Sequence, residues 1–142
     1  MTSNITVRPA RTSDVKAIQA MRQQLEGSKV LLGHELVSLY EAVPEFLVAV
    51  DEAGAVVGAG ALHVMWEDLA EVRSMVVSEN LRGTGVGHAV LEALLSKAQS
   101  VGIKRVFCLT FETAFFGKHG FAEISDVPVD EATFEQMVRS HD

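Results

Sequence analysis

A glycine-rich stretch between a strand-like segment and a helix-like segment is the feature that most constrains the fold. Residues 70–77 are largely apolar and favour a strand, whereas residues 85–101 carry apolar side chains at helical spacing. Gly83, Gly85 and Gly87 lie between or at the start of these elements. Glycine lets a backbone approach a ligand closely, and the first turn of a helix presents unpaired N–H groups at the positive end of its dipole. The combination predicts an anion site suited to a pyrophosphate.

The remaining apolar pattern predicts one α/β domain over residues 1–142. Helices come first, then a two-stranded hairpin, then a strand–helix–strand unit, and this order favours a single mixed, twisted sheet flanked by helices. The segments at 46–50 and 56–65 flank a turn and are expected to pair as an antiparallel hairpin. Strands are predicted at 5–9, 46–50, 56–65, 70–77, 105–110 (buried) and 122–125, and helices at 15–25, 36–43, 85–101, 114–119 and after residue 130.

Composition and charge exclude several classes of protein. Hydrophobic residues make up 48% and charged residues 22% of the chain, as in globular rather than disordered proteins. We find no apolar run long enough for a transmembrane helix and no secretory signal, and we therefore expect the cytoplasm. The net charge is -7 without a cluster of Lys and Arg, so nucleic acid binding is not expected. An anion must then be bound by backbone N–H groups and a few placed cations.

Cysteine and histidine usage adds further expectations. Cys108 is the single cysteine, lies in an apolar run and is interpreted as a buried core residue rather than a catalytic thiol. His63 and Trp66, on and just after a predicted strand, are interpreted as packing residues. No group of His, Cys and Asp has the spacing of metal ligands, so the sequence predicts no metal.

Two common diphosphate-binding motifs do not fit the glycine-rich stretch. A Rossmann fingerprint would need a glycine at His88, and a P-loop would need a Gly-Lys-Ser/Thr triplet, which the chain lacks. Arg82, Gly85 and Gly87 instead form Arg-x-x-Gly-x-Gly, which resembles motif A of the GNAT acetyltransferases, whose loop wraps the pyrophosphate of coenzyme A. The resemblance spans most of the chain and includes Val7-Arg8-Pro9-Ala10 with the helix that follows, the hairpin, Val77 before the loop, and Phe116-Gly117-Lys118-His119-Gly120-Phe121.

This resemblance implies a GNAT fold and acetyl-CoA as the acetyl donor. The strand before motif A would bind the pantetheine arm through the backbone of Met75, Val76 and Val77. The pyrophosphate would lie on the amides of Arg82, Gly83, Thr84, Gly85, Val86, Gly87 and His88. Phe116, which we include among the coenzyme-binding residues, stands where some GNAT branches place a tyrosine that acts as general acid. The thiolate of coenzyme A would then leave directly, or take its proton from water or from the amine.

The resemblance also implies roles for three charged residues. Glu71 matches the glutamate that serves as general base in several GNAT branches; the alternative is an ion-pair partner of Arg73 or a solvated edge residue. An amine attacks a thioester only when it is neutral, so a carboxylate within reach can take its proton. Alternation places residues 71, 73 and 75 on one strand face. Arg73 could therefore hold a substrate carboxylate, or form only a salt bridge, and Lys29 is a second candidate contact or simply an exposed residue.

Further matches resemble the short, stand-alone type of N-acetylglutamate synthase. They imply transfer of acetyl to the α-amino group of L-glutamate or a close relative, the first acetylated intermediate of arginine synthesis. The alternatives are an acetyltransferase for another small amine or a peptide N-terminus, and a non-catalytic CoA-sensing module. The matches are Lys29-Val30-Leu31-Leu32, Leu39-Tyr40-Glu41-Ala42-Val43, Ala61-Leu62-His63, Leu109-Thr110, Phe115-Phe116 and His119-Gly120-Phe121.

Two departures from that type accompany the matches. Gly33 and His34 follow Leu32 where longer bacterial synthases carry an arginine pair. The chain also ends at Asp142, where the family usually adds a strand that closes the sheet, so the closing strand is expected to be missing or supplied by another subunit. A homodimer is the resulting hypothesis.

Overall fold

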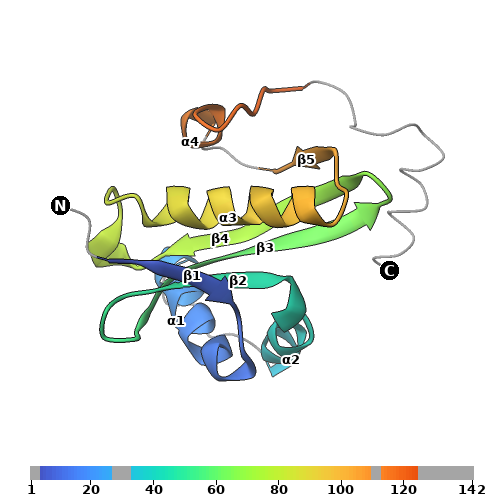
Figure 1. Cartoon of the computed structure of the whole chain (residues 1–142). Coiled ribbons are helices and arrows are strands. Elements are labelled where there is room, and N and C mark those ends of the chain that lie inside the picture. Colours follow the sequence, from blue (N-terminus) through green and yellow to red (C-terminus); the bar gives the residue numbers. More distant parts are fainter. Residues whose placement is uncertain (1–3, 27–32, 110–112, 125–142) are drawn as a thin grey trace.

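The structure, a computed structural model, describes residues 4–26, 33–109 and 113–124 and contains one five-stranded sheet with helices on both faces (Figure 1). Lys29, a predicted substrate contact, and residues 125–142 lie outside the described residues. The strands are β1 (Thr6–Pro9), β2 (Phe46–Val50), β3 (Val56–Trp66), β4 (Leu69–Val77) and β5 (Arg105–Phe107). The helices are α1 (Val15–Glu26), α2 (Gly33–Glu41), α3 (Val86–Ser100) and α4 (Thr113–Gly117), with 3-10 turns η1 (Thr12–Asp14), η2 (Val43–Glu45) and η3 (Glu79–Leu81).

The sheet follows the order of the sequence, β1-β2-β3-β4-β5. Neighbouring strands from β1 to β4 are antiparallel, and β2 and β3 form the predicted hairpin. β5 is parallel to β4. Parallel neighbours require a crossover connection, and α3 provides it. The mixed sheet predicted from the sequence is thereby confirmed.

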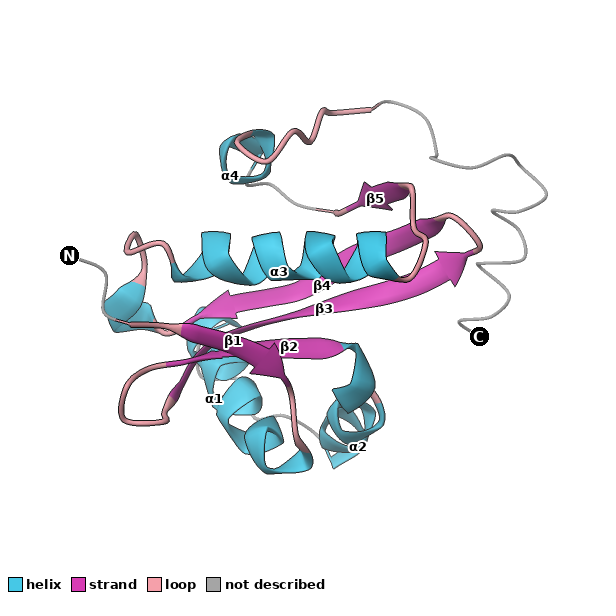
Figure 2. Ribbon diagram, in the orientation of Figure 1, coloured by secondary structure: helices cyan, strands magenta, loops and turns pink. Residues whose placement is uncertain are grey.

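The two faces of the sheet are covered by different helices (Figure 2). α3 packs on one face, where its apolar side chains Val90, Leu91 and Leu94 are fully buried with residues of β3 and β4. α1 and α2 pack on the other face, where Val15, Ile18 and Leu39 are buried. The apolar stripe of each helix thus meets one face of the sheet, as expected for a layered α/β domain.

An ion pair ties the start of the sheet to the start of α1. The Arg8 guanidinium donates to both oxygens of the Asp14 carboxylate at 2.8 and 3.1 Å, and the Arg11 backbone N–H donates to Asp14 at 2.7 Å. The hydrogen bonds from Arg8 lower the pKa of the buried Asp14 carboxyl below its ordinary value, against the opposing effect of burial. The chain therefore turns from β1 into α1 around a charged anchor.

A β-bulge in β4 overturns one prediction about side-chain direction. Ala61 pairs with Arg73 and Ala59 with Val76, so β4 carries one more residue than β3 between these pairs. Ser74 lies in this bulge, and its backbone adopts the left-handed conformation, at φ of 59°. Met75 consequently packs with the α3 face rather than sharing the face of residues 71 and 73, as strict alternation had predicted.

The helix and strand boundaries agree with prediction over most of the described chain. α3 falls within one residue of its predicted ends, and Gly102 follows it in a left-handed conformation at φ of 93°. β5 is shorter than predicted and only partly buried, because it lies at the sheet edge. The strand predicted at 122–125 is wrong for residues 122–124, which are irregular, and residue 125 and the helix predicted after residue 130 lie outside the described segments.

Within the described segments, every helix is too short or too polar to cross a membrane.

Candidate active site

The predicted anion site lies at the junction of η3 and α3. Gly85 caps α3 in a left-handed conformation at φ of 95°, which a side chain would disfavour, and Gly83 is also left-handed at φ of 82°. The Thr84 hydroxyl donates to the Leu81 carbonyl at 2.5 Å and stabilises the turn. The N–H groups of the first turn of α3, from Val86 on, have no partner within the helix. The loop and the helix end thus have the left-handed glycines and the unpaired N–H groups on which the predicted anion site depends.

Phe115 of α4 and His119, which follows α4, lie against the start of α3. The Phe115 ring would lie 3.3 Å from a Cβ at Gly87, so a larger residue there would require the ring to move by a few tenths of an ångström. The His88 ring lies 4.5 Å from the Phe115 ring, centroid to centroid, and its Nδ1 lies 2.7 Å from Nε2 of His119. His119 and Phe115 were not predicted as neighbours of the loop, because they come from a segment about thirty residues later.

In the hydrogen bond between His88 and His119, only one of the two facing nitrogens can carry a proton. At 2.7 Å one nitrogen donates and the other accepts, so both rings cannot carry a proton on the facing atoms. Burial lowers the pKa of His88 below its ordinary value, and the positive charges of His119 and Lys118 lower it further. His88 is therefore a neutral ring at pH 7 beside the loop.

The edge of β4 is open near this loop. β5 pairs with β4 only from Leu69 to Glu71, so the described residues provide no strand partner on that side for Val72–Val77. The other side of β4 stays paired with β3, including Val76 with Ala59 and Val77 with Gly58. The backbone N–H and C=O groups of β4 beyond Glu71 that point away from β3 are thus available to an extended ligand.

Glu71 and Arg73 form an ion pair on the face of the sheet that α1 and α2 cover. Arg73 donates from Nη2 and Nε to the same oxygen of Glu71, Oε1, at 2.8 and 3.2 Å. The Glu71 side chain is 13% exposed and that of Arg73 33%. Both members of the predicted acceptor site therefore lie together, and the second carboxylate oxygen, Oε2, has no hydrogen-bond partner among the described residues.

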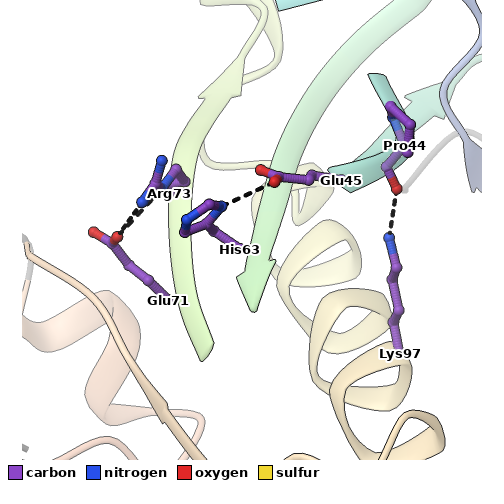
Figure 3. A network of polar contacts seen from close by, with 6 residues as sticks. All are labelled: Pro44, Glu45, His63, Glu71, Arg73 and Lys97. Carbon is purple, nitrogen blue, oxygen red and sulfur yellow. Dashed lines mark hydrogen bonds and ion pairs between the residues drawn. The ribbon is translucent and has the colours of Figure 1, made fainter. Parts of the chain in front are cut away.

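A second polar pair lies beside the first. His63 is the direct cross-strand neighbour of Glu71, and its Nδ1 lies 2.9 Å from Oε2 of Glu45 in η2 (Figure 3). The ring, which we interpreted as a packing residue, is half-buried and is bound to a carboxylate. Trp66 is 40% exposed, which also contradicts a packing role within the described chain. Glu45 and His63 are 18 residues apart in the sequence, so no short-range spacing pattern indicated that their side chains meet.

Cys108 follows β5 and is partly buried, at the margin of the α3-side core rather than within it. Burial raises the pKa of its thiol, and the negative charge of Glu71 raises it further. A protonated thiol is a poor nucleophile, which agrees with the prediction that Cys108 is not catalytic.

Phe116 is buried in the same α3-side core. Its ring makes edge-to-face contacts with Phe115 and Phe121, at centroid distances of 5.0 and 5.3 Å. Phe116 therefore anchors α4 in this core. Its ring offers no acidic proton. Among the described residues, no group of three His, Cys, Asp or Glu side chains has the geometry of a metal site.

Comparison with known proteins agrees with this arrangement. Residues 16–121 match the acetyltransferase (GNAT) family. The chain is 51% identical over 138 residues to an amino-acid acetyltransferase of Mycobacterium tuberculosis, covering 96% of this chain and 79% of that protein.

Two solved structures share the fold. The crystal structure of Rv2747 from Mycobacterium tuberculosis in complex with CoA and NLQ superposes with a TM-score of 0.87 at 50% identity, covering 96% of this chain and 83% of that one. N-acetylglutamate synthase from Neisseria gonorrhoeae, complexed with coenzyme A and N-acetyl-glutamate, gives a TM-score of 0.76 at 25% identity, over 99% of this chain and 33% of that one. The resemblance to short amino-acid acetyltransferases, drawn from the sequence, is confirmed. The chain belongs to the GNAT family of acetyltransferases.

Proposed function

We propose that the chain is an amino-acid N-acetyltransferase that transfers acetyl from acetyl-CoA to the α-amino group of L-glutamate or a close relative. The observation that carries the proposal is the position of Glu71 on β4. This strand leads from a carboxylate on the α1–α2 face to the anion-binding loop at the start of α3. One strand thus connects a candidate base to a candidate coenzyme site. The similarity to the mycobacterial amino-acid acetyltransferase supports the same class of acceptor.

The acetyl donor would be held mainly by main-chain groups. The diphosphate of acetyl-CoA would lie on the amides of residues 82–88, with Arg82, exposed at the edge of the loop, as an added cation. The pantetheine arm would pair with the open edge of β4 at Met75, Val76 and Val77. Backbone binding explains how a chain of net charge -7 can bind a polyanion.

The chemistry follows from the position of Glu71. The acceptor enters as an ammonium ion, and Glu71 Oε2 accepts a proton, directly or through water. The neutral amine attacks the thioester carbonyl carbon, the carbon–sulfur bond breaks, and the thiolate of coenzyme A leaves. The second proton lost by the amine reaches the thiolate directly or through water, because the Phe116 ring has none to give. The products are the N-acetyl amino acid, coenzyme A with a thiol, and one proton released to solvent.

Arg73 would orient the acceptor while it holds the base. Its hydrogen bonds to Glu71 use Nε and Nη2, and Nη1 has no hydrogen-bond partner among the described residues. A planar guanidinium can bind two carboxylates at once, so Arg73 would hold a carboxylate of the acceptor next to Glu71. Lys29 remains a second proposed contact.

Thiol release from acetyl-CoA with a panel of acceptors tests this function. We expect turnover with glutamate or glutamine and little with polyamines or peptides. Turnover confined to polyamines or peptides would instead support a different acetyltransferase. Binding of acetyl-CoA without turnover on any amine would support a CoA-sensing module.

We also propose that residues 1–142 act as one catalytic domain, working as a homodimer in the cytoplasm. Among the described residues, β5 has no strand on its outer side, and Leu109 just after it is 84% exposed. Both observations support a second copy of the chain that covers this edge of the sheet. Cys108 is unpaired, as is usual in a reducing compartment. A single-chain mass by light scattering at working concentration would exclude the dimer.

A further inference from the structure

The pair formed by His63 and Glu45 has no part in the mechanism above, although it adjoins the proposed base. β3 and β4 pair regularly here: Ala61 with Arg73, and His63 with Glu71. Directly opposed residues of an antiparallel pair lie on the same face, with Cβ atoms about 4.5–5.5 Å apart. The imidazole therefore lies on the face of Glu71, and Figure 3 shows it between Glu45 and the Glu71–Arg73 pair.

The histidine is held in place from two sides of the fold. Nδ1 of His63 is bound to Glu45 at 2.9 Å, and the two side chains are 24% and 33% exposed. Glu45 follows Pro44, whose carbonyl accepts a hydrogen bond from Nζ of Lys97 at 3.0 Å (Figure 3). Lys97 belongs to α3, so the helix on the opposite face steadies the turn that presents Glu45.

The proposed reaction leaves a proton that must be carried away. Each turnover releases one net proton, and Glu71 must lose the proton it accepted before the next amine can bind. Glu71 is only 13% exposed and Arg73 occupies one of its oxygens, so direct exchange with solvent is restricted. An imidazole can accept a proton on one ring nitrogen and release one to solvent, so a histidine beside Glu71 can carry a proton away from it.

We propose that His63, oriented by Glu45, is the proton-relay residue that takes the proton from Glu71 and passes it to solvent. The inference rests on the proposed function and adds a positioning pair to it. In the forward step, the O–H bond of protonated Glu71 breaks and an N–H bond forms on His63, with or without an intervening water. The imidazolium then loses a proton to solvent or buffer. Among the described residues, Glu45 of η2 is bound to the ring, and Glu71 and Arg73 of β4 are the charged groups that lie beside it on the same face of the sheet (Figure 3).

The test is the variant His63→Gln, which keeps an N–H group for Glu45 but cannot carry a proton. We expect kcat at pH 7 to fall about 10- to 100-fold while KM for acetyl-CoA and the melting temperature stay unchanged. Added imidazole buffer should then raise the rate of the variant with concentration, because the buffer replaces the missing relay, and should leave the parent enzyme unaffected. The relay would be overturned if His63→Gln had the kcat of the parent enzyme, or if added imidazole did not restore its lost activity.

Two further variants complete the experiment. Glu45→Gln keeps a hydrogen bond to the ring but removes the charge, so we expect a smaller loss of kcat than in His63→Gln. Glu67→Gln makes the same chemical change in the exposed turn between β3 and β4 and should match the parent enzyme. All rates are measured with whichever amine gives turnover. An incorrect choice of acceptor thus leaves the relay test intact, whereas no turnover on any amine overturns the proposed function and the relay together.

Discussion

On the α3 face, the candidate coenzyme site consists of main-chain groups from one continuous segment, whereas the candidate acceptor site on the α1–α2 face consists of side chains from three elements. Gly85 and the first turn of α3 need only the local conformation of residues 82–88. Glu71, His63 and Glu45 need the register of two strands and the position of a 3-10 turn. A site of the first kind depends on backbone angles, and one of the second kind on tertiary packing.

This difference predicts which substitutions affect chemistry and which affect coenzyme binding. The largest effect is expected at Glu71. Changing Glu71 to Gln removes the proposed base, so kcat should fall about 100- to 1,000-fold at neutral pH, within the range for general base catalysis. The rate should recover in part at alkaline pH, where more of the amine is already neutral. Initial rates from pH 6 to 10 measure this, and an unchanged pH profile would remove Glu71 as the base.

The role of the loop in binding the coenzyme is tested by the same substitution at each end of α3. Gly85 and Gly102 have nearly the same left-handed conformation, at φ of 95° and 93°. Replacement by Ala costs about 1–2 kcal/mol of strain at either position, so both variants should lose similar stability. Only Gly85→Ala disturbs the loop, and its affinity for acetyl-CoA should fall about 10-fold, the equivalent of ~1.4 kcal/mol. Calorimetric titration measures the affinities, and equal affinities in the two variants would contradict a site at this loop.

A smaller effect, on stability, is expected at the anchor of the α1–α2 face. Asp14→Asn removes the charge that receives the hydrogen bonds of Arg8 and should lower the free energy of unfolding by about 1–3 kcal/mol. The affinity for acetyl-CoA should change little, because the anchor lies across the sheet from α3. Denaturant unfolding and calorimetry together check this, and a parallel loss of coenzyme affinity would show that the faces are coupled.

The pH dependence of the same anchor has a defined sign. The pKa of Asp14 is lower in the folded than in the unfolded chain, so below its ordinary value of 3.8 the unfolded chain binds more protons. The stabilisation from the ion pair is therefore fully present above that pH and is lost as the pH falls through the folded value. The stability difference between the parent and Asp14→Asn should shrink over this range.

The smallest effect is expected at His88. Its pKa is lowered by burial, so as the pH falls below its ordinary value of 6.5 the unfolded chain takes up a proton first and the folded state loses stability. His88→Gln should therefore lose less stability than the parent between pH 7.5 and 5.5. Thermal unfolding at both pH values measures the difference, and equal losses would contradict the inferred environment of the ring.

The comparison of the two faces also explains how much could be predicted from the sequence. The loop and α3 were predicted closely because glycine spacing and helical periodicity are local signals, and Gly85 and Gly102 mark the helix ends. The antiparallel pairing of β2 with β3 was predicted as a hairpin, since a short turn between two strands favours antiparallel neighbours. The pairing of Glu71 with Arg73 also followed from alternation along one strand.

The failures arise where the structure departs from local periodicity. The bulge at Ser74 has no glycine to mark it, so alternation placed Met75 on the wrong face. His63 is bound to Glu45 and His88 to His119 across long separations, and single-sequence spacing holds no information on such contacts. The irregular path of residues 122–124 likewise contradicts an apolar pattern that favoured a strand.

The close seating of α3 on β3 has a consequence for variants that never touch a substrate. A Cβ at Gly58 would lie 2.7 Å from Cγ1 of Val86, the first residue of the helix, whereas one at Gly60 would lie 2.5 Å from Sδ of Met75 on β4 and 2.9 Å from Cδ1 of Leu94, near the middle of the helix. A methyl group at Gly58 would therefore press on the first residue of α3, whereas one at Gly60 would meet the flexible side chain of Met75 first. Of these two substitutions on one strand, the one at Gly58 acts on the helix end that carries the proposed coenzyme site, and the one at Gly60 acts within the core.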